Sequence, residues 1–281
     1  MGLFNIFRSR TTTNRADKIA DFTVATAEYG SAVPEILGTT RIGGNVLYYD
    51  DFTAHEHRET HRAGKGGGRH KIVNITYTYT VAAILGLCEG PISGIGRVWI
   101  GKNVFDYPNE TIGLSLFKGE ENQVPWAYVQ GKHPEKALPY SGLAYMAGVI
   151  ELGESAAFPN YTFEVKGKLL NTGDGVDVNP ADYVRYVLDK VGLGDVHIEG
   201  LENYRKYCRE SDLLISTPAG DLGAKSAHEI INDIMSLTNS YMFWSNNRFK
   251  IVPLEDRPVG SWKPNTTIMY NLSADGFLEQ S

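Results

Sequence analysis

The sequence of 281 residues has little cysteine, no long apolar run and no excess of positive charge. Its two cysteines, Cys88 and Cys208, are too few for a disulfide framework. Both have apolar or aromatic neighbours, which predicts buried free thiols. This is the usual state of cysteine in a protein that folds in a reducing compartment.

Membrane attachment has no support in the sequence either. No run reaches the roughly 18 apolar residues that a membrane-spanning helix needs. The apolar stretch near Met1 is too short for a signal peptide, and Ile6 stands where N-myristoylation requires Ser or Thr. We therefore expect synthesis in the cytosol and no membrane anchor.

The charge balance limits the partners that the chain can attract. Lys and Arg number 27 and Asp and Glu number 33, so the net charge is -6. This argues against nucleic-acid binding through the overall field of the molecule. The abundant residues are 30 glycines and 16 tyrosines, and threonine is also frequent, a mixture that favours strands and turns over a helical bundle.

The pattern along the chain predicts an extended arm followed by a β-rich domain. Residues 1–25 are polar and aperiodic, and we expect them to be ordered only if a partner holds them. In residues 26–168, a strict period of two over 74–81 predicts a strand, and the apolar run that follows it over 82–87 predicts a central position in a sheet. The weak pattern of residues 106–158 predicts an insertion. Further strands are expected at 40–50, 97–105 (a hairpin turning at 101–103) and 161–165.

Residues 169–281 change to helical spacing. Asn179 before Pro180 predicts a helix start, and Ser226 with Glu229 forms a capping box. Two strands follow, at 241–244 and 248–252, joined by Ser245-Asn246-Asn247. The predicted fold class is α+β and predominantly β: a β-barrel-like domain with an insertion, then a helix-containing α+β domain.

Histidines and glycines between 55 and 70 are the sharpest candidates for chemistry. On a helix, His57 and His61 could grip one metal, but Glu59 would then lie on the opposite face, so the zinc-protease pattern fails. The glycines from Gly64 onward lack the order of a phosphate-binding loop. We predict a poorly ordered loop over 55–70 with no bound metal.

Other candidates are equally weak. The neighbouring acids Asp50 and Asp51, like Glu120 and Glu121, are interpreted as solvated surface. The four tryptophans do not cluster in sequence, which favours packing or interface roles over sugar stacking. They are Trp99, Trp126, Trp244 and Trp262. We predict no catalytic, cofactor-binding or metal-binding residues, and no enzymatic activity.

Five ordered blocks resemble the tail-tip hub proteins of long-tailed phages and prophages, a family that includes the lambda-type tail-tip attachment protein and gene-transfer-agent hubs. Two of them are the glycine-rich segment 29–45 and the strand block 79–100, which contains Leu87-Cys88-Glu89-Gly90-Pro91-Ile92. The others run from 179 to 208, from 227 to 258 and from 270 to 278. Family members usually continue past the last block, so we expect the 169–281 domain to be incomplete at its C-terminus.

The resemblance implies a structural virion protein at the distal end of a tail tube. Such a hub closes the tube and couples receptor engagement to DNA passage, without sequence-specific DNA binding. It implies a homotrimer, with the tail-tube or distal-tail protein and other tip proteins as partners. We expect a weak tendency of the isolated chain to form threefold rings. The alternatives are a receptor- or carbohydrate-binding tail module, and a tail-associated cell-wall hydrolase.

Overall fold

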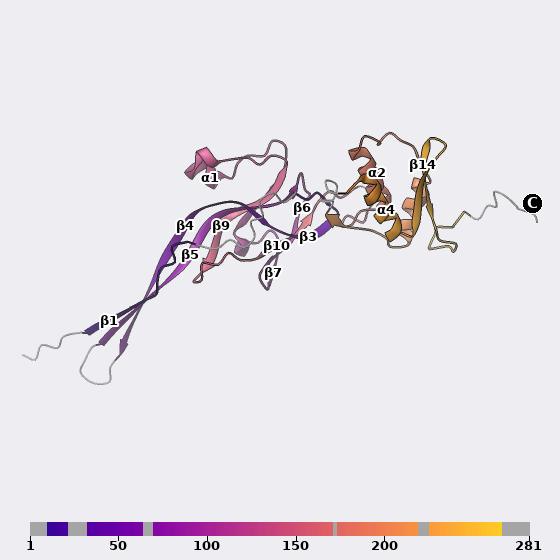
Figure 1. Cartoon of the computed structure of the whole chain (residues 1–281). Helices are drawn as coiled ribbons and strands as arrows, with labels where there is room; N and C mark the ends of the chain where they lie inside the picture. The colour runs from indigo at the N-terminus through magenta and orange to yellow at the C-terminus, as the bar shows by residue number, and fades with distance from the viewer. Residues whose placement is uncertain (1–9, 22–32, 64–69, 171–172, 219–224, 266–281) are drawn as a thin grey trace, which may run out of the picture. The chain divides into compact units, whose positions relative to one another are not determined.

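A computed structural model describes residues 10–21, 33–63, 70–170, 173–218 and 225–265. The chain divides into two compact units, Met1–Lys168 and Leu169–Ser281, each described here by itself (Figure 1). The division falls close to residue 170, where the sequence pattern changes from strand to helix. The glycine run 64–68, most of the arm 1–25 and the block 270–278 lie outside the described residues.

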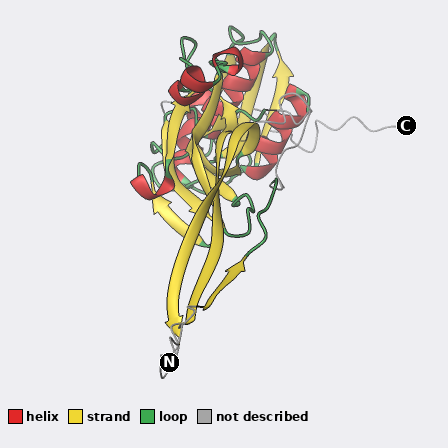
Figure 2. Cartoon of the chain, turned by 90° about the vertical axis from the view of Figure 1, so that its left-hand side faces the viewer, coloured by secondary structure: helices red, strands yellow, loops and turns green. Residues whose placement is uncertain are grey.

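The first unit contains a large sheet built on two long antiparallel strands, β4 (Asn45–Ala63) and β5 (His70–Glu89). The parallel strand β1 (Arg10–Arg15) pairs with the outer part of β5. The inner part of β5 pairs with β9 (Leu143–Gly153), and β9 pairs with β8 (Leu114–Lys118). The outer ends of β4 and β5 therefore form a narrow ribbon with β1 (Figures 1 and 2).

A second sheet of the first unit has the strand order β3 (Thr39–Gly43), β10 (Tyr161–Lys166), β6 (Gly94–Ile100) and β7 (Asn103–Asp106). The predicted hairpin is confirmed as β6 and β7, with Gly101 in the left-handed conformation its turn requires. The short strand β2 (Ile36–Leu37) precedes β3.

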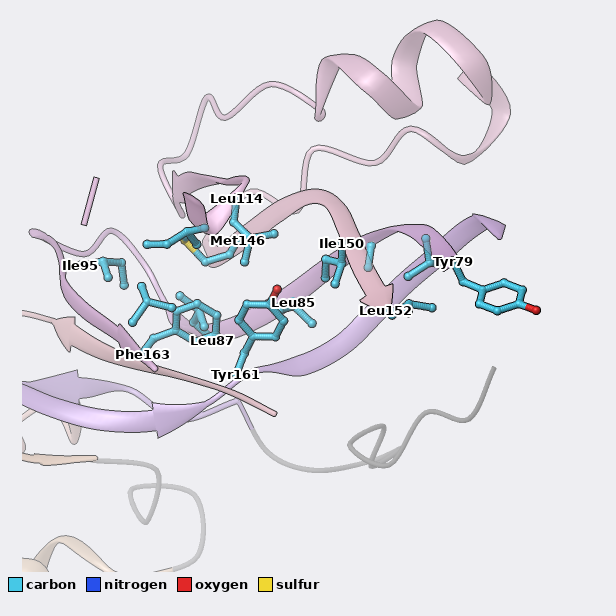
Figure 3. Packing of buried hydrophobic residues seen from close by; sticks show 14 of the residues in the cluster. Tyr79, Leu85, Leu87, Ile95, Leu114, Met146, Ile150, Leu152, Tyr161 and Phe163 are labelled. Carbon is cyan, nitrogen blue, oxygen red and sulfur yellow. The ribbon is translucent and has the colours of Figure 1, made fainter. Parts of the chain in front are cut away.

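One buried cluster joins the two sheets (Figure 3). It contains Leu85 and Leu87 of β5, Met146 of β9, and Tyr161 and Phe163 of β10. The sheets approach closely because a glycine lies between them: a Cβ at Gly44 would stand 3.0 Å from the Phe163 ring and 3.2 Å from Leu85. Burial of apolar side chains in this cluster is the main source of stability for the unit.

The opposite face of the large sheet is also covered. Ile84, Tyr145 and Ala147 are buried there beneath Phe117, Trp126, Tyr140 and Tyr48. Trp126 precedes the short helix α1 (Ala127–Lys132), which is followed by the 3-10 turn η2 (Pro134–Lys136). A further 3-10 turn, η1 (Glu110–Ile112), precedes β8. The predicted central strand is thus confirmed, since β5 is apolar on both faces where both faces are covered.

Two expectations about this unit are wrong. Residues 106–158 are not an insertion, because β9 pairs with β5 along its whole length and buries residues on both of its faces. The longest part of 106–158 that lies outside the strands is the segment between β8 and β9, residues 119–142. The expected barrel is also absent from the described residues, whose sheets are open.

Two further expectations fail at the outer ribbon. Residues 10–15 of the arm need no partner protein, because β5 of the same chain pairs with them as β1. Residues 55–63 are not a loop, because they continue β4 in register with residues 70–78 of β5. Apolar period is missing from this part of β4 because the side chains of residues 55–62 are exposed.

Three helices form the helical part of the second unit: α2 (Pro180–Lys190), α3 (Leu201–Glu210) and α4 (Ala227–Leu237). Both predicted caps are confirmed. The Asn179 side chain accepts from the Ala181 amide, and Ser226 with Glu229 makes the reciprocal capping box. Asn179 is fully buried and also donates to the Arg205 carbonyl, which ties α2 to α3.

The strands of the second unit are β11 (Ile198–Glu199), β12 (Thr217–Pro218), β13 (Ser240–Ser245) and β14 (Arg248–Pro253). β14 lies between β11 and β13, and the predicted hairpin of β13 and β14 is confirmed. Asn246 and Asn247 have φ values of 52 and 58°, as their turn requires.

Both cysteines are free and buried, as predicted. Each unit contains one of them, Cys88 on β5 and Cys208 on α3. Among the described residues, no helix combines the length and apolar character that crossing a membrane requires.

Candidate functional site

A cluster of charged and polar side chains lies where β4 meets the 119–142 segment. The pairing of β4 with β5 is irregular between Asp50 and Thr53, and Asp51 has a φ of 54°. Non-glycine residues rarely adopt this left-handed conformation, so it marks a locally constrained backbone. The Asp50 carboxylate supports the bend, because it accepts a hydrogen bond of 2.8 Å from the Asp51 amide.

Four side chains from the 119–142 segment surround these two carboxylates. The Tyr128 hydroxyl donates to Asp51 at 2.9 Å, and the His133 Nε2 lies 3.2 Å from the same oxygen. Lys132 Nζ is 3.6 Å from Asp51, and Lys136 Nζ donates to Asp50 at 2.6 Å. The two aspartates are therefore partly buried ion-pair partners and not simply solvated surface.

The electrostatics favour the charged forms of both acids. The hydrogen bond from Lys136 is the main reason that the pKa of Asp50 falls to about 2. The hydrogen bond from Tyr128 is the main cause of a lowered pKa at Asp51. Burial, and then the nearby Asp50 carboxylate, raises the pKa of Tyr48 to about 12.

Asp50, Asp51 and His133 also offer three ligand atoms within 4.8 Å of one another. A divalent cation at this point would have to compete with Lys132 and Lys136, which already compensate the two carboxylates. The arrangement therefore functions as a clamp that fastens the 119–142 segment to β4. Each acid and base in it is engaged by another member of the cluster.

The histidines of the predicted loop lie on the exposed part of β4. His55 and His57 point to the same face as the threonines of β5, and their Nε2 atoms lie 2.9 Å from Thr80 Oγ1 and 2.7 Å from Thr78 Oγ1. Along a strand, His57 and His61 are separated by about 14 Å at Cα, so they cannot share a metal ion. The helical spacing considered for them does not apply.

A long feature open to a neighbour is the free edge of β4. Within the described residues β4 pairs with β5 alone, so one edge of its 19 residues has no strand partner. At the other edge of the large sheet, β8 likewise pairs only with β9 among these residues. Unpaired backbone donors and acceptors along such edges are templates for another strand.

A second exposed surface lies on the β13–β14 hairpin. Tyr241 and Phe243 stack with ring centroids 5.9 Å apart and are 60% and 38% exposed. Their cross-strand partners on the same face are Val252 and Lys250. Trp244 is 54% exposed and makes an edge contact with Phe249 on the other face. Exposed aromatic groups of this kind mark sites of contact with a ligand or another protein.

The remaining tryptophans have packing roles. Trp262 is buried, donates to Asn203 at 3.0 Å and contacts the Tyr207 ring. Trp99 carries the Arg41 guanidinium over its ring at 4.0 Å. Trp126 covers the outer face of the large sheet.

Known proteins resemble the chain only distantly. No family model and no curated protein sequence matches it. Among solved structures, it is similar to a chain in a structure titled "Virion of native gene transfer agent (GTA) particle", with 19% sequence identity and a TM-score of 0.44. The similarity covers 64% of this chain and 45% of that chain, so less than half of the neighbour's length is represented. A likeness of this size assigns no activity.

Proposed function

We propose that this chain is a structural protein of a phage-type virion, and that it forms the hub at the distal end of a tail tube. The observation that carries the proposal is the free 19-residue edge of β4, at one side of a sheet whose other side, within the described residues, ends in the open strand β8. A subunit with two different open edges can join identical neighbours head to tail and close a ring.

The position of the resembling sequence blocks supports the same function. The block at 79–100 forms the inner half of β5, the following turn and β6, which lie at the centre of both sheets. The hub resemblance therefore coincides with the core that fixes the two sheets relative to each other. In this function the chain acts as a homotrimer, contacts the tail-tube or distal-tail protein and lets DNA pass without reading its sequence.

The proposal assigns no enzymatic activity to the chain. A cell-wall hydrolase of the glycosidase type would need two carboxylates facing a sugar ring, whereas Asp50 and Asp51 are engaged by lysine, histidine and tyrosine side chains. A peptidoglycan zymogram tests this directly, and clearing by the purified chain would contradict the proposal.

Sedimentation at rising concentration, with and without the tail-tube partner, tests the hub function. We expect a monomer at low concentration and a threefold species at high concentration or with the partner. Tyr49→Lys, at a 54% exposed position on β4, should weaken this association, because a lysine on an edge strand opposes pairing. The control Val191→Lys, at a 50% exposed position of the second unit, should leave it unchanged. A stable twofold dimer that ignores the partner would contradict the proposal.

The β13–β14 hairpin favours a second candidate, a receptor- or carbohydrate-binding module. Its exposed aromatic side chains offer flat surfaces on which sugar rings can stack. A glycan array with the intact chain and with Tyr241→Ala distinguishes this function from the hub. Binding that Tyr241→Ala abolishes would favour the module.

A further inference from the structure

The outer end of the β4–β5 ribbon carries a concentration of positive charge that the net charge of -6 conceals. Arg62 on β4 lies directly opposite Lys71 on β5, so the two side chains share one face of the ribbon. Arg58 is four positions before Arg62 on the same strand and therefore lies on this face too. We name these three exposed residues the basic end.

Acidic groups near the basic end are engaged elsewhere. Among the described residues, no carboxylate forms an ion pair with Arg58, Arg62 or Lys71. The nearby Glu56 is engaged by Arg15 at 3.0 Å, and Glu59 faces the other side of the ribbon, where it lies 3.5 Å from His61. Like charges directly opposite each other destabilise an isolated sheet, and an anion between them removes that repulsion.

Hydroxyl groups complete this face. Thr60 lies between Arg58 and Arg62 on β4, and Thr11 pairs with Lys71 from β1. Phosphate oxygens accept hydrogen bonds from arginine, lysine and threonine side chains, so the composition matches a phosphate backbone. The apolar residues in the same rows, Val73 and Ile75, are buried. A membrane-inserting surface would instead present an apolar face.

We propose that the basic end binds the phosphate backbone of double-stranded DNA without sequence preference. Arg58 and Arg62 are about 14 Å apart along the strand. Over that length a DNA strand, with one phosphate per about 3.4 Å of axis, presents several phosphates. Three cations can therefore engage the backbone together. The choice of DNA over other polyanions rests on the proposed function, in which DNA passes the hub.

Fluorescence anisotropy with a labelled duplex of random sequence, about two helical turns long, tests the proposal on the full chain. Three phosphate contacts predict a slope of about -2.7 for log K against log salt, which weakens binding about 40-fold between roughly 50 and 200 mM salt. The triple variant Arg58→Gln, Arg62→Gln, Lys71→Gln should lose at least about tenfold in affinity at the lower salt concentration, with a slope near zero. Its unfolding midpoint should not fall, since the variant removes a repulsion.

A matched triple variant controls for the change in net charge. Lys102→Gln, Arg257→Gln, Lys263→Gln removes three exposed cations elsewhere and should keep the wild-type affinity and slope. Equal losses in the two triple variants, or no duplex binding by the wild type at low salt, would overturn the proposal. It would also be overturned if phosphatidylserine vesicles bound through the basic end while the duplex did not.

The outcome is separable from that of the hub proposal. The basic-end variant should still form the threefold species with the tail-tube partner in sedimentation. If the basic-end variant loses duplex binding but still forms the ring, both proposals are supported. If the variant loses duplex binding and not even the wild type forms a ring, only the proposal for the basic end is supported.

Discussion

The hydroxyl of Tyr128 donates a hydrogen bond of 2.9 Å to the carboxylate of Asp51, across 77 positions of the sequence. Together with the contact between Lys136 and Asp50 at 2.6 Å, it fastens the 119–142 segment to β4. Trp126, in the same segment, covers the outer face of the large sheet. The clamp therefore protects apolar surface of β5 and β9 from water, and it depends on ionised carboxylates.

Acid should weaken this clamp in a defined range. The pKa of Asp50 is about 2 in the folded chain and about 3.9 when unfolded, so its stabilisation is complete above pH ~4 and is lost as the pH falls toward 2. The substitution Asp50→Asn, which replaces the acid with a neutral amide, should make the urea midpoint of the first unit depend less on pH across this range. Glu154→Gln, at an exposed carboxylate, should keep the wild-type dependence. Identical pH profiles for the wild type and Asp50→Asn would contradict this account.

The packing between the two sheets should be the most sensitive part of the first unit. Phe163 is fully buried on β10, and Phe163→Ala should destabilise the unit by about 3–5 kcal/mol, through lost burial and a cavity. Val104→Ala on β7, at a 51% exposed position, should cost about 0.5 kcal/mol or less. Urea denaturation followed by tryptophan fluorescence measures both. Similar costs for the two variants would show that the contact between the sheets contributes little.

The sequence predicted the elements that carry alternation, a helix cap, or an apolar run that continues an alternating strand. Alternation placed Ile75, Tyr77 and Tyr79 on the buried face of β5, and the caps at Asn179 and Ser226 marked the starts of α2 and α4. These signals are local, because each depends on residues within one turn or one strand. The same reasoning failed for β9, whose short apolar run is buried on both faces and shows no clear period.

The polar cluster could not be predicted in the same way. Asp50 and Asp51 are adjacent, but Tyr128, His133 and Lys136 reach them only after the chain has passed through both sheets. No motif or spacing in the sequence indicates that these side chains come together. The outer part of β4 was predicted to be a loop for a related reason. Its exposed side chains carry no apolar period, and only its register with the distant strand β5 shows that it is a strand.

The two confirmed helix caps should contribute differently to the free energy of unfolding of the second unit. Asn179→Ala removes the cap of the Ala181 amide and also the hydrogen bond from the buried Asn179 side chain to the Arg205 carbonyl, so we expect a loss of about 2–3 kcal/mol from the second unit. Ser226→Ala removes an exposed cap and should cost about 1 kcal/mol. Chemical denaturation of both variants measures the difference. A larger loss for Ser226→Ala would mean that the link from α2 to α3 is unimportant.

The two buried thiols allow the units to be followed separately. Burial raises the pKa of both Cys88 and Cys208 to about 12, so neither should react with a thiol reagent at mildly alkaline pH in the native chain. Cys208→Ala leaves a thiol that reports on the first unit, and Cys88→Ala leaves one that reports on the second. In moderate urea, Phe163→Ala should speed labelling of Cys88 but not of Cys208, and Asn179→Ala should do the reverse, since each core is stabilised by its own contacts. If either substitution accelerated the labelling of both thiols equally, the two units would unfold as one cooperative unit. The division after Lys168 would then not separate two independently stable parts.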